Sequence, residues 1–160
     1  MVAEGLAPID LTQVDVRVRP GPLPFAPPAA NAAITWKGRD VLWLGPDEWL
    51  VVAEPGGAAA IARELDTALT GHHHSVIDVG ANRIAFDLTD GLESLASGCG
   101  LDLDPTRWRP GMCAQTLVGQ AQVILHQLDE RTTRIFVRPS FAGYLTRLLA
   151  SVQPSSSASI

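Results

Sequence analysis

The chain has 160 residues, the length of one domain with at most a short additional segment. Its 46% hydrophobic and 18% charged residues exclude a wholly disordered chain, and its net charge of −5 argues against binding to the phosphate backbone of nucleic acids. No apolar stretch reaches the roughly 20 residues of a membrane span. No signal peptide is visible, and the two cysteines make no disulfide framework. We therefore expect a cytoplasmic protein that contacts neither membrane nor nucleic acid.

Two segments are predicted to lack regular structure. Residues 20–28 contain five prolines, which neither a helix nor a central strand tolerates, so 20–32 is predicted to form a proline-rich arm or surface loop. The tail 151–160 is rich in serine and is expected to fray. A single domain is therefore predicted over 1–150, and we expect the proline-rich segment to lie against a partner chain.

In the first half of the chain, the spacing of apolar residues predicts three strands and a helix. Alternation of apolar and polar residues predicts a short strand over 14–18. The apolar runs 41–44 and 49–52 flank a Gly-Pro-Asp-Glu turn sequence and predict a hairpin. Apolar residues at helical spacing predict a helix over 56–69, ended by a glycine.

The second half is predicted to alternate strands with short helices. Strands are expected over 76–79, 84–88, 115–118, 121–125 and 134–137. A short helix around 92–96 is predicted to have Asp90 as its N-cap, and Ser140 is predicted to cap a last helix. The fold class is therefore α+β, a mostly antiparallel sheet with about three helices on one face.

The predicted strands 76–79 and 84–88 are separated by a short segment that begins with Gly80-Ala81. A glycine at the first central position suits a type II′ turn, which would place Asp78 opposite Arg83 as a cross-strand ion pair. The apolar residues of the two strands would then share a buried face: Ile77, Val79 and Ile84.

Three groups of residues are candidates for chemistry. His72-His73-His74 offers either two metal ligands on one face of an extended segment or a polar link, and the absence of a second ligand cluster favours the link. Cys99 and Cys113 lack the C-x-x-C spacing of a redox pair, which favours small buried thiols over nucleophiles. The segment 98–103 has leucine at the third glycine of a dinucleotide fingerprint and follows a predicted helix, so it predicts no dinucleotide site.

The tryptophans allow two interpretations. Trp36, Trp43, Trp49 and Trp108 are large anchors in a chain with only 6% aromatic residues. They fit packing in the core, and they also fit a surface that binds a partner, where tryptophan is enriched.

Five blocks in chain order resemble one protein family. They are Leu44-Gly45-Pro46-Asp47-Glu48-Trp49-Leu50, Asp78-Val79-Gly80-Ala81-Asn82-Arg83, Gly98-Cys99-Gly100-Leu101-Asp102-Leu103, Gly111-Met112-Cys113-Ala114-Gln115-Thr116, and Arg138-Pro139-Ser140-Phe141-Ala142-Gly143-Tyr144-Leu145. The chain thereby resembles the gamma subunit of heterotetrameric sarcosine oxidase over about residues 40–150. It departs from the family pattern at Gly80, where serine is usual.

The resemblance implies an α+β fold similar to the folate-binding domain of glycine-cleavage T-proteins. It also implies a non-catalytic accessory subunit in sarcosine catabolism and one-carbon metabolism. The whole enzyme demethylates sarcosine oxidatively to glycine, with hydrogen peroxide and either methylene-tetrahydrofolate or formaldehyde as further products.

The resemblance also implies how the work is divided among the subunits. FAD, FMN, NAD and tetrahydrofolate are expected on the larger partner subunits, with the alpha subunit as the main contact. No catalytic, cofactor-binding or metal-binding residue is implied in this chain, and the isolated chain is expected to be inactive. The structural or interface candidates are Trp43, Trp49, Asp78, Arg83, Gln115, Thr116, Ser140 and Phe141.

A rival hypothesis is a stand-alone folate-binding domain of the same fold that handles one-carbon units, because a fold does not determine a function. Such a domain needs a polar pocket with an acidic side chain directed at the pterin ring. Asp87, Asp102 and Asp104 are the available candidates, and none of them lies in a recognisable motif.

Overall fold

The computed structural model describes residues 6–19 and 21–152. Ten strands and three helices follow one another along these residues. They are β1 (Pro8–Ile9), β2 (Thr12–Val18), β3 (Ala33–Trp36), β4 (Arg39–Gly45), β5 (Glu48–Ala53), α1 (Ala58–Ala68), β6 (His74–Asp78), β7 (Ile84–Thr89), α2 (Leu92–Gly98), β8 (Cys113–Val118), β9 (Ala121–Gln127), β10 (Thr132–Val137) and α3 (Pro139–Ser151).

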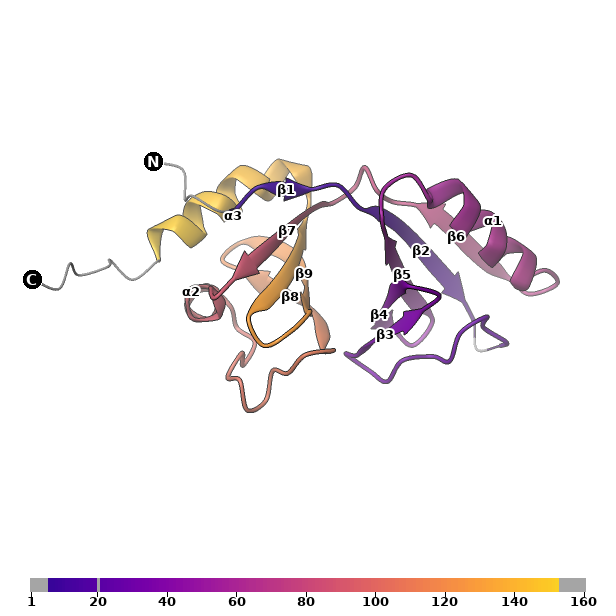
Figure 1. Ribbon diagram of the computed structural model, residues 1–160, viewed down its shortest axis with the longest axis horizontal. Helices are drawn as coiled ribbons and strands as arrows, with labels where there is room; N and C mark the ends of the chain where they lie inside the picture. Colours follow the sequence, from indigo (N-terminus) through magenta and orange to yellow (C-terminus); the bar gives the residue numbers. More distant parts are fainter. Residues whose placement is uncertain (1–5, 20, 153–160) are drawn as a thin grey trace, which may run out of the picture.

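The strands form two antiparallel sheets. The first sheet has the order β3-β4-β5-β2-β6, and the second has the order β1-β7-β10-β9-β8. The predicted α+β class with antiparallel pairing and three helices is confirmed, but the expectation of one sheet is wrong. The chain passes from the second sheet to the first between β1 and β2, and back again between β6 and β7 (Figure 1).

Helices cover the outer face of each sheet. Ile61, Leu65 and Leu69, in and just after α1, pack on the outer face of the first sheet. Leu145 and Leu149 of α3, together with Leu95 of α2, pack on the outer face of the second sheet. Figure 1 shows α1 at one end of the long axis and α2 and α3 at the other, with both sheets between them.

A third apolar cluster lies between the two sheets. Leu42 and Leu50 of the first sheet contribute to it, with Ile124 and Phe136 of the second sheet. Both sheets are therefore buried on both faces over much of their length, which explains why runs such as 49–52 are continuously apolar rather than alternating. The layers run helix, sheet, sheet, helix.

Glycines with positive φ angles occur in two of the hairpin turns. The predicted β4–β5 and β8–β9 hairpins are confirmed, and Gly119 has a φ of 57°, the sign that a type II′ turn requires at its first central position. The β3–β4 hairpin was not predicted. Its two-residue turn has φ angles of 51° at Lys37 and 74° at Gly38, as in type I′ turns.

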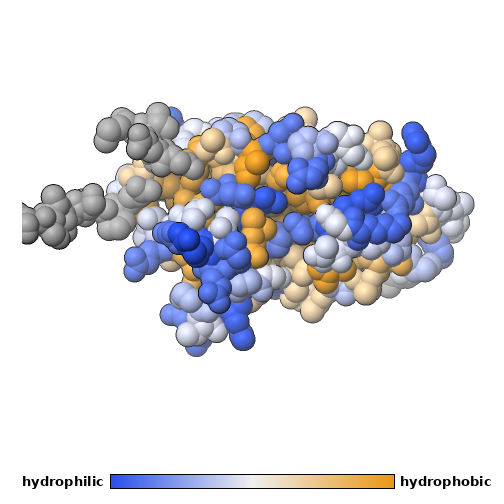
Figure 2. Space-filling view, viewed as in Figure 1, coloured by the Kyte–Doolittle hydropathy of each residue, from blue (hydrophilic) through white to orange (hydrophobic). Residues whose placement is uncertain are grey.

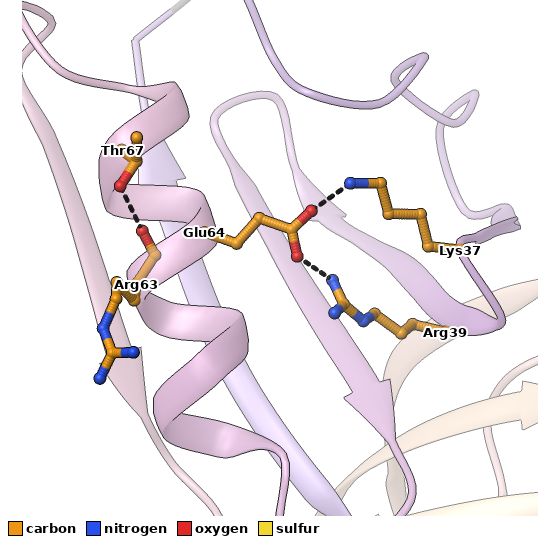
Figure 3. A network of polar contacts seen from close by, with 5 residues as sticks. All are labelled: Lys37, Arg39, Arg63, Glu64 and Thr67. Atoms are coloured by element: carbon orange, nitrogen blue, oxygen red, sulfur yellow. Dashed lines mark hydrogen bonds and ion pairs between the residues drawn. The ribbon is translucent and has the colours of Figure 1, made fainter.

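Glu64 of α1 ties that helix to the β3–β4 hairpin (Figure 3). Its carboxylate accepts hydrogen bonds from Lys37 and from Arg39, the latter at 2.7 Å. These bonds, that from Lys37 first, hold the pKa of Glu64 below its usual value. The Arg39 guanidinium also lies 5.0 Å from the centre of the Trp36 ring. Because exposed ion pairs add little stability, the contact mainly orients the helix on the sheet.

The expected turn at Gly80-Ala81 is wrong. β6 pairs with β2 in the first sheet, whereas β7 pairs with β1 and β10 in the second, so Asp78 and Arg83 do not face each other. Asp78 instead accepts a hydrogen bond from the Gly80 amide at 3.0 Å. Ile77 is 54% exposed and shares no buried face with Ile84. The segment between β6 and β7 connects the first sheet to the second. The types of residue in a turn do not show whether it joins strands of one sheet or of two.

Two predicted helix caps are wrong as well. α2 begins after Gly91, while Asp90 pairs with Arg131. α3 begins after Arg138, because Pro139 suits the first helical position, where its missing N–H costs nothing. The helix continues to Ser151, so the tail cannot begin at 151, and the rest of the predicted tail from 153 lies outside the described residues.

The proline-rich segment packs partly on its own chain. Pro20 lies outside the described residues. Phe25 is buried, with its ring centre 5.3 Å from that of Trp36 and 6.2 Å from that of Trp49. Phe25 is therefore packed on its own chain, and contact of the exposed residues around it with a partner stays a prediction. Among the described residues, no helix combines the length and apolarity needed to cross a membrane.

We expect Gly119→Ala to lower the free energy of unfolding by about 1–3 kcal/mol. The residue has a positive φ, and an added methyl group would collide with the Tyr144 hydroxyl and the Leu148 side chain. Urea denaturation measures the change. Gly100→Ala is the control, because open space surrounds Gly100 and its effect should stay below about 0.5 kcal/mol. Equal effects of the two substitutions would contradict the proposed clash.

Candidate functional site

Three of the four tryptophans lie in the hydrophobic core. Trp36 and Trp49 are buried in the cluster on the outer face of the first sheet, and Trp43, directly opposite Trp49, is half-buried beside it. Trp108 is buried in the cluster of the second sheet and donates a hydrogen bond to Gln127 at 2.7 Å. For Trp36, Trp49 and Trp108, core packing is the interpretation that the structure supports.

Gln115 and Thr116 hold neighbouring elements together. The Gln115 amide donates a hydrogen bond to the Leu44 carbonyl oxygen at 2.8 Å and so connects β8 of the second sheet to β4 of the first. The Thr116 hydroxyl lies 3.7 Å from the Cys99 sulfur. Ser140 and Phe141 occupy the first turn of α3, where the Phe141 ring stacks edge-on against Tyr144 and is 38% exposed.

The three histidines connect α1 to β6. His74 contacts Asp66 of α1 at 2.9 Å and the His72 carbonyl oxygen at 2.7 Å. The carbonyl contact first, and then Asp66, raises the pKa of His74. Within residues 6–19 and 21–152, no three His, Cys, Asp or Glu side chains are grouped in a way that would hold a metal ion. The polar-link interpretation fits these contacts.

The register of the second sheet places four polar side chains in one row. Cys113 pairs with His126, His126 with Arg134, and Arg134 with Asp87. Arg134 donates two hydrogen bonds to Asp87, at 2.8 and 2.9 Å. Burial raises the pKa of Cys113 to about 11, and the thiol lies 3.6 Å from the Trp43 carbonyl oxygen. A buried thiol of this kind is not poised to act as a thiolate nucleophile.

His126 is, like Cys113, a fully enclosed member of this row. It is 5% exposed, and its Nδ1 has no hydrogen-bond partner among the described residues. Burial holds the pKa of His126 below its usual value, against the attraction of Asp40 on the facing sheet. The imidazole is therefore neutral at physiological pH and fills space in the layer between the sheets.

The acids that a pterin site would need are engaged in local contacts. Asp87 is held by Arg134, and Asp104 accepts hydrogen bonds from the Thr106 amide and hydroxyl, the former at 2.8 Å. Asp102 lies 3.3 Å from Arg107. Asp102 and Asp104 also line an open hollow of about 460 Å³ beside α2.

A cluster of charged residues lies where the inner faces of the two sheets meet, and we call it the inter-sheet charge cluster: Asp15, Arg17, Glu48, Arg83 and Arg138. On the first sheet, the Arg17 guanidinium lies 2.7 Å from Glu48 and 3.5 Å from Asp15. Burial first, and then the neighbouring Asp15, raises the pKa of Glu48. The charges of Arg17 and Arg83 oppose this rise of the Glu48 pKa.

The second sheet contributes two arginines to this cluster. Val137 pairs with Ile84, so Arg138 and Arg83, which flank that pair, lie next to each other at the end of β10 and the start of β7. Burial lowers the pKa of Arg83, Asp15 and Glu48 oppose this effect, and Arg138 adds to it. The arrangement offers no nucleophile, but it positions fixed charges that can bind another charged group.

Only Arg83 of this cluster was among the residues singled out from the sequence. Glu48 and Arg138 lie in the blocks 44–50 and 138–145, but neither had been distinguished within its block. Asp15 and Arg17 could have been found from the alternation Val14-Asp15-Val16-Arg17-Val18, which places both charges on one face of a strand. The sequence does not show that these residues lie close together, because they come from two different sheets that pack against each other.

We expect Glu48→Gln to leave stability at pH 7 unchanged or to raise it by up to about 1 kcal/mol. Because the folded-state pKa of Glu48 is raised, its stabilising contribution is fully present only below the unfolded-state pKa and is lost as pH rises through the folded-state value. Glutamine removes this dependence, so the two proteins should converge as the pH falls and Glu48 takes up a proton.

Urea denaturation across the acid and neutral range measures this difference. Glu130→Gln, a change at an exposed turn residue, is the matched control and should show no such pH dependence. A clear loss of stability in Glu48→Gln at pH 7 would mean that the Arg17 ion pair outweighs the cost of burying the charge.

Comparison with known proteins identifies relatives along most of the chain. The profile of the sarcosine oxidase, gamma subunit family matches residues 23–156. The sarcosine oxidase subunit gamma of Corynebacterium sp. (strain P-1) is 32% identical over 151 residues, covering 86% of this chain and 73% of that protein. The subunit gamma of an Arthrobacter species has the same identity and coverage.

Two solved structures have the same fold. A chain of the heterotetrameric sarcosine oxidase from Corynebacterium sp. U-96, solved in complex with pyrrole 2-carboxylate, superimposes with a TM-score of 0.82 and 28% identity, covering 92% of this chain and 82% of that one. The glycine cleavage system aminomethyltransferase T from Bartonella henselae superimposes with a TM-score of 0.68 and 16% identity, covering 91% of this chain and 45% of that one. The second likeness shows the fold alone.

Proposed function

The chain belongs to the sarcosine oxidase gamma subunit family, and we propose that it serves as a non-catalytic subunit that docks on and stabilises the larger subunits of a heterotetrameric sarcosine oxidase. The observation that carries the proposal is the structural match over 92% of the chain to a heterotetrameric sarcosine oxidase. The match covers most of both chains, 92% of this one and 82% of its relative, which supports an equivalent role.

The polar contacts within the chain support a structural role. Gln115 connects the two sheets, His74 connects α1 to β6, and Arg134 holds Asp87 within its own sheet. The proposed enzyme converts sarcosine to glycine and hydrogen peroxide, with the methyl carbon leaving as methylene-tetrahydrofolate or formaldehyde. In this proposal FAD, FMN, NAD and tetrahydrofolate are bound by the partner subunits, and the assembly works in the cytoplasm with the alpha subunit as the main contact of this chain.

Contacts within the chain suggest different roles for five of the candidate residues. Trp49, Gln115 and Thr116 have partners within the chain, so we assign them to its internal packing. Arg83 and the exposed Phe141 remain available at the surface, so we propose them for the contact with the partner.

We expect this chain to co-elute with the other subunits of a sarcosine oxidase from the same organism when all are co-expressed. Binding to folded partners stabilises both sides by mass action, so omission of this chain should lower the thermal midpoint of the remaining assembly. The purified chain alone should form no peroxide from sarcosine. Separate elution, or peroxide formation by the isolated chain, would contradict the proposal.

The folate-binding alternative has its own test. The likeness to aminomethyltransferase T is one of fold, so we expect isothermal titration of the isolated chain with tetrahydrofolate to show no saturable binding. Stoichiometric binding that Asp104→Asn abolishes would favour a stand-alone folate site at the hollow beside α2.

A further inference from the structure

Arg83 and Arg138 lie at the end of the second sheet without an ion-pair partner of their own in the described part of the chain. The inter-sheet charge cluster contains three guanidiniums and two carboxylates, and Arg17 engages both carboxylates. Among the described residues, no carboxylate lies within 4.0 Å of the guanidinium of Arg83 or Arg138, and neither guanidinium donates a hydrogen bond. This local excess of positive charge occurs on a chain whose net charge is −5.

Arg83 differs from other unpaired surface arginines because it is half-buried. Burial holds its pKa below its usual value, and the neighbouring Arg138 adds repulsion. A buried charge without a direct partner lowers stability, so a group that supplies negative charge from outside would relieve this cost.

The register places these arginines beside an uncovered part of the sheet. Val137 pairs with Val123 and with Ile84, and Gln122 pairs with Leu117. Extending this register by one residue gives a row across four strands, which we call the open row: Leu117, Gln122, Arg138 and Arg83. Farther along the same strands, Ile124 and Phe136 of this inner face are buried against the first sheet, whereas Leu117 is 50% exposed.

The open row combines a hollow with an apolar residue. A hollow of about 600 Å³ is lined by Gln115, Leu117 and Gln122 among others. Leu117 is one of three large hydrophobic residues that the described surface exposes. On the face that Figure 2 displays, apolar patches are small and separated by hydrophilic residues. This face therefore shows no broad apolar interface. Arginine beside an exposed aliphatic side chain is a composition typical of a protein interface.

We propose that the open row is the docking surface for a partner subunit, with an acidic side chain of that partner bound between Arg83 and Arg138 and an apolar side chain packed on Leu117. The inference rests on the proposed function and names the chemistry of its interface. Charge complementarity favours an acidic partner over a second copy of this chain, because the open row of a second copy carries the same two arginines. Guanidiniums bind carboxylates through two parallel hydrogen bonds, which also fixes the orientation of the partner.

The test is to measure the affinity of the purified chain for the assembly of the other sarcosine oxidase subunits, by interferometry at low and at physiological salt. We expect Arg138→Glu to weaken binding at least about tenfold, and Leu117→Asp to do the same. Arg63→Glu on α1 makes the same charge change at an exposed position of another layer, and should change the affinity less than about twofold. Arg138→Gln should make binding less dependent on salt.

The outcomes separate this inference from the proposed function. If the unmodified chain does not bind the other subunits, both fall. If it binds and the variants Arg138→Glu and Leu117→Asp bind equally well, the open row is not the interface, although the proposed function stands. A concentration-dependent dimer of this chain that Leu117→Asp abolishes would assign the surface to a second copy and would overturn the inference. Because Arg138 and Leu117 are exposed, the circular dichroism of both variants should match that of the unmodified chain, and the melting temperature of Arg138→Glu should not fall, since the change removes repulsion at Arg83.

Discussion

The apolar layer between the two sheets is the constraint on which the rest of this structure depends. Each sheet already buries one face under helices, so the shared layer makes both sheets apolar on both faces. Strand β5 shows the result, because four successive residues from Trp49 to Val52 are buried. Polar groups that enter this layer need partners there, and this is why Arg134 and Asp87 meet within one sheet.

Because the layer between the sheets is apolar, the charged residues of the inter-sheet charge cluster lie at its edge. The centre of the inner faces is apolar, and Asp15, Glu48 and the two arginines gather at one edge of this layer. A surface assembled in this way is rigid, because each charged residue lies in a strand of a buried sheet or directly next to the end of one. This rigidity suits a subunit whose task is to hold a partner in place.

The sequence predicted the individual helices and hairpins better than it predicted how the strands are divided between sheets. Helical spacing identified α1 and α3, and turn chemistry identified the β4–β5 and β8–β9 hairpins, because these signals are local. The partition into two sheets was missed, since a strand buried on both faces has no alternation that shows which neighbour it takes. For the same reason, Gly80 was assigned to a hairpin turn although the chain there crosses from one sheet to the other. In the charge cluster, Arg83 was recognised but was given the wrong partner, because its true neighbours come from β2, from β5 and from the end of β10.

The two crossings between the sheets affect the order in which the protein can form during synthesis. β1 precedes the other described strands in the chain, yet its ladder partner is β7, which follows every strand of the first sheet. The first sheet draws its strands from β2 to β6 and can assemble while later residues are still being added. The second sheet can form only after residues through β10 have been synthesised. Its edge strand β1 then has to pair with β7, and the long stretch of chain between them makes this a slow, long-range contact. Strand β1 is therefore among the last elements to find its place.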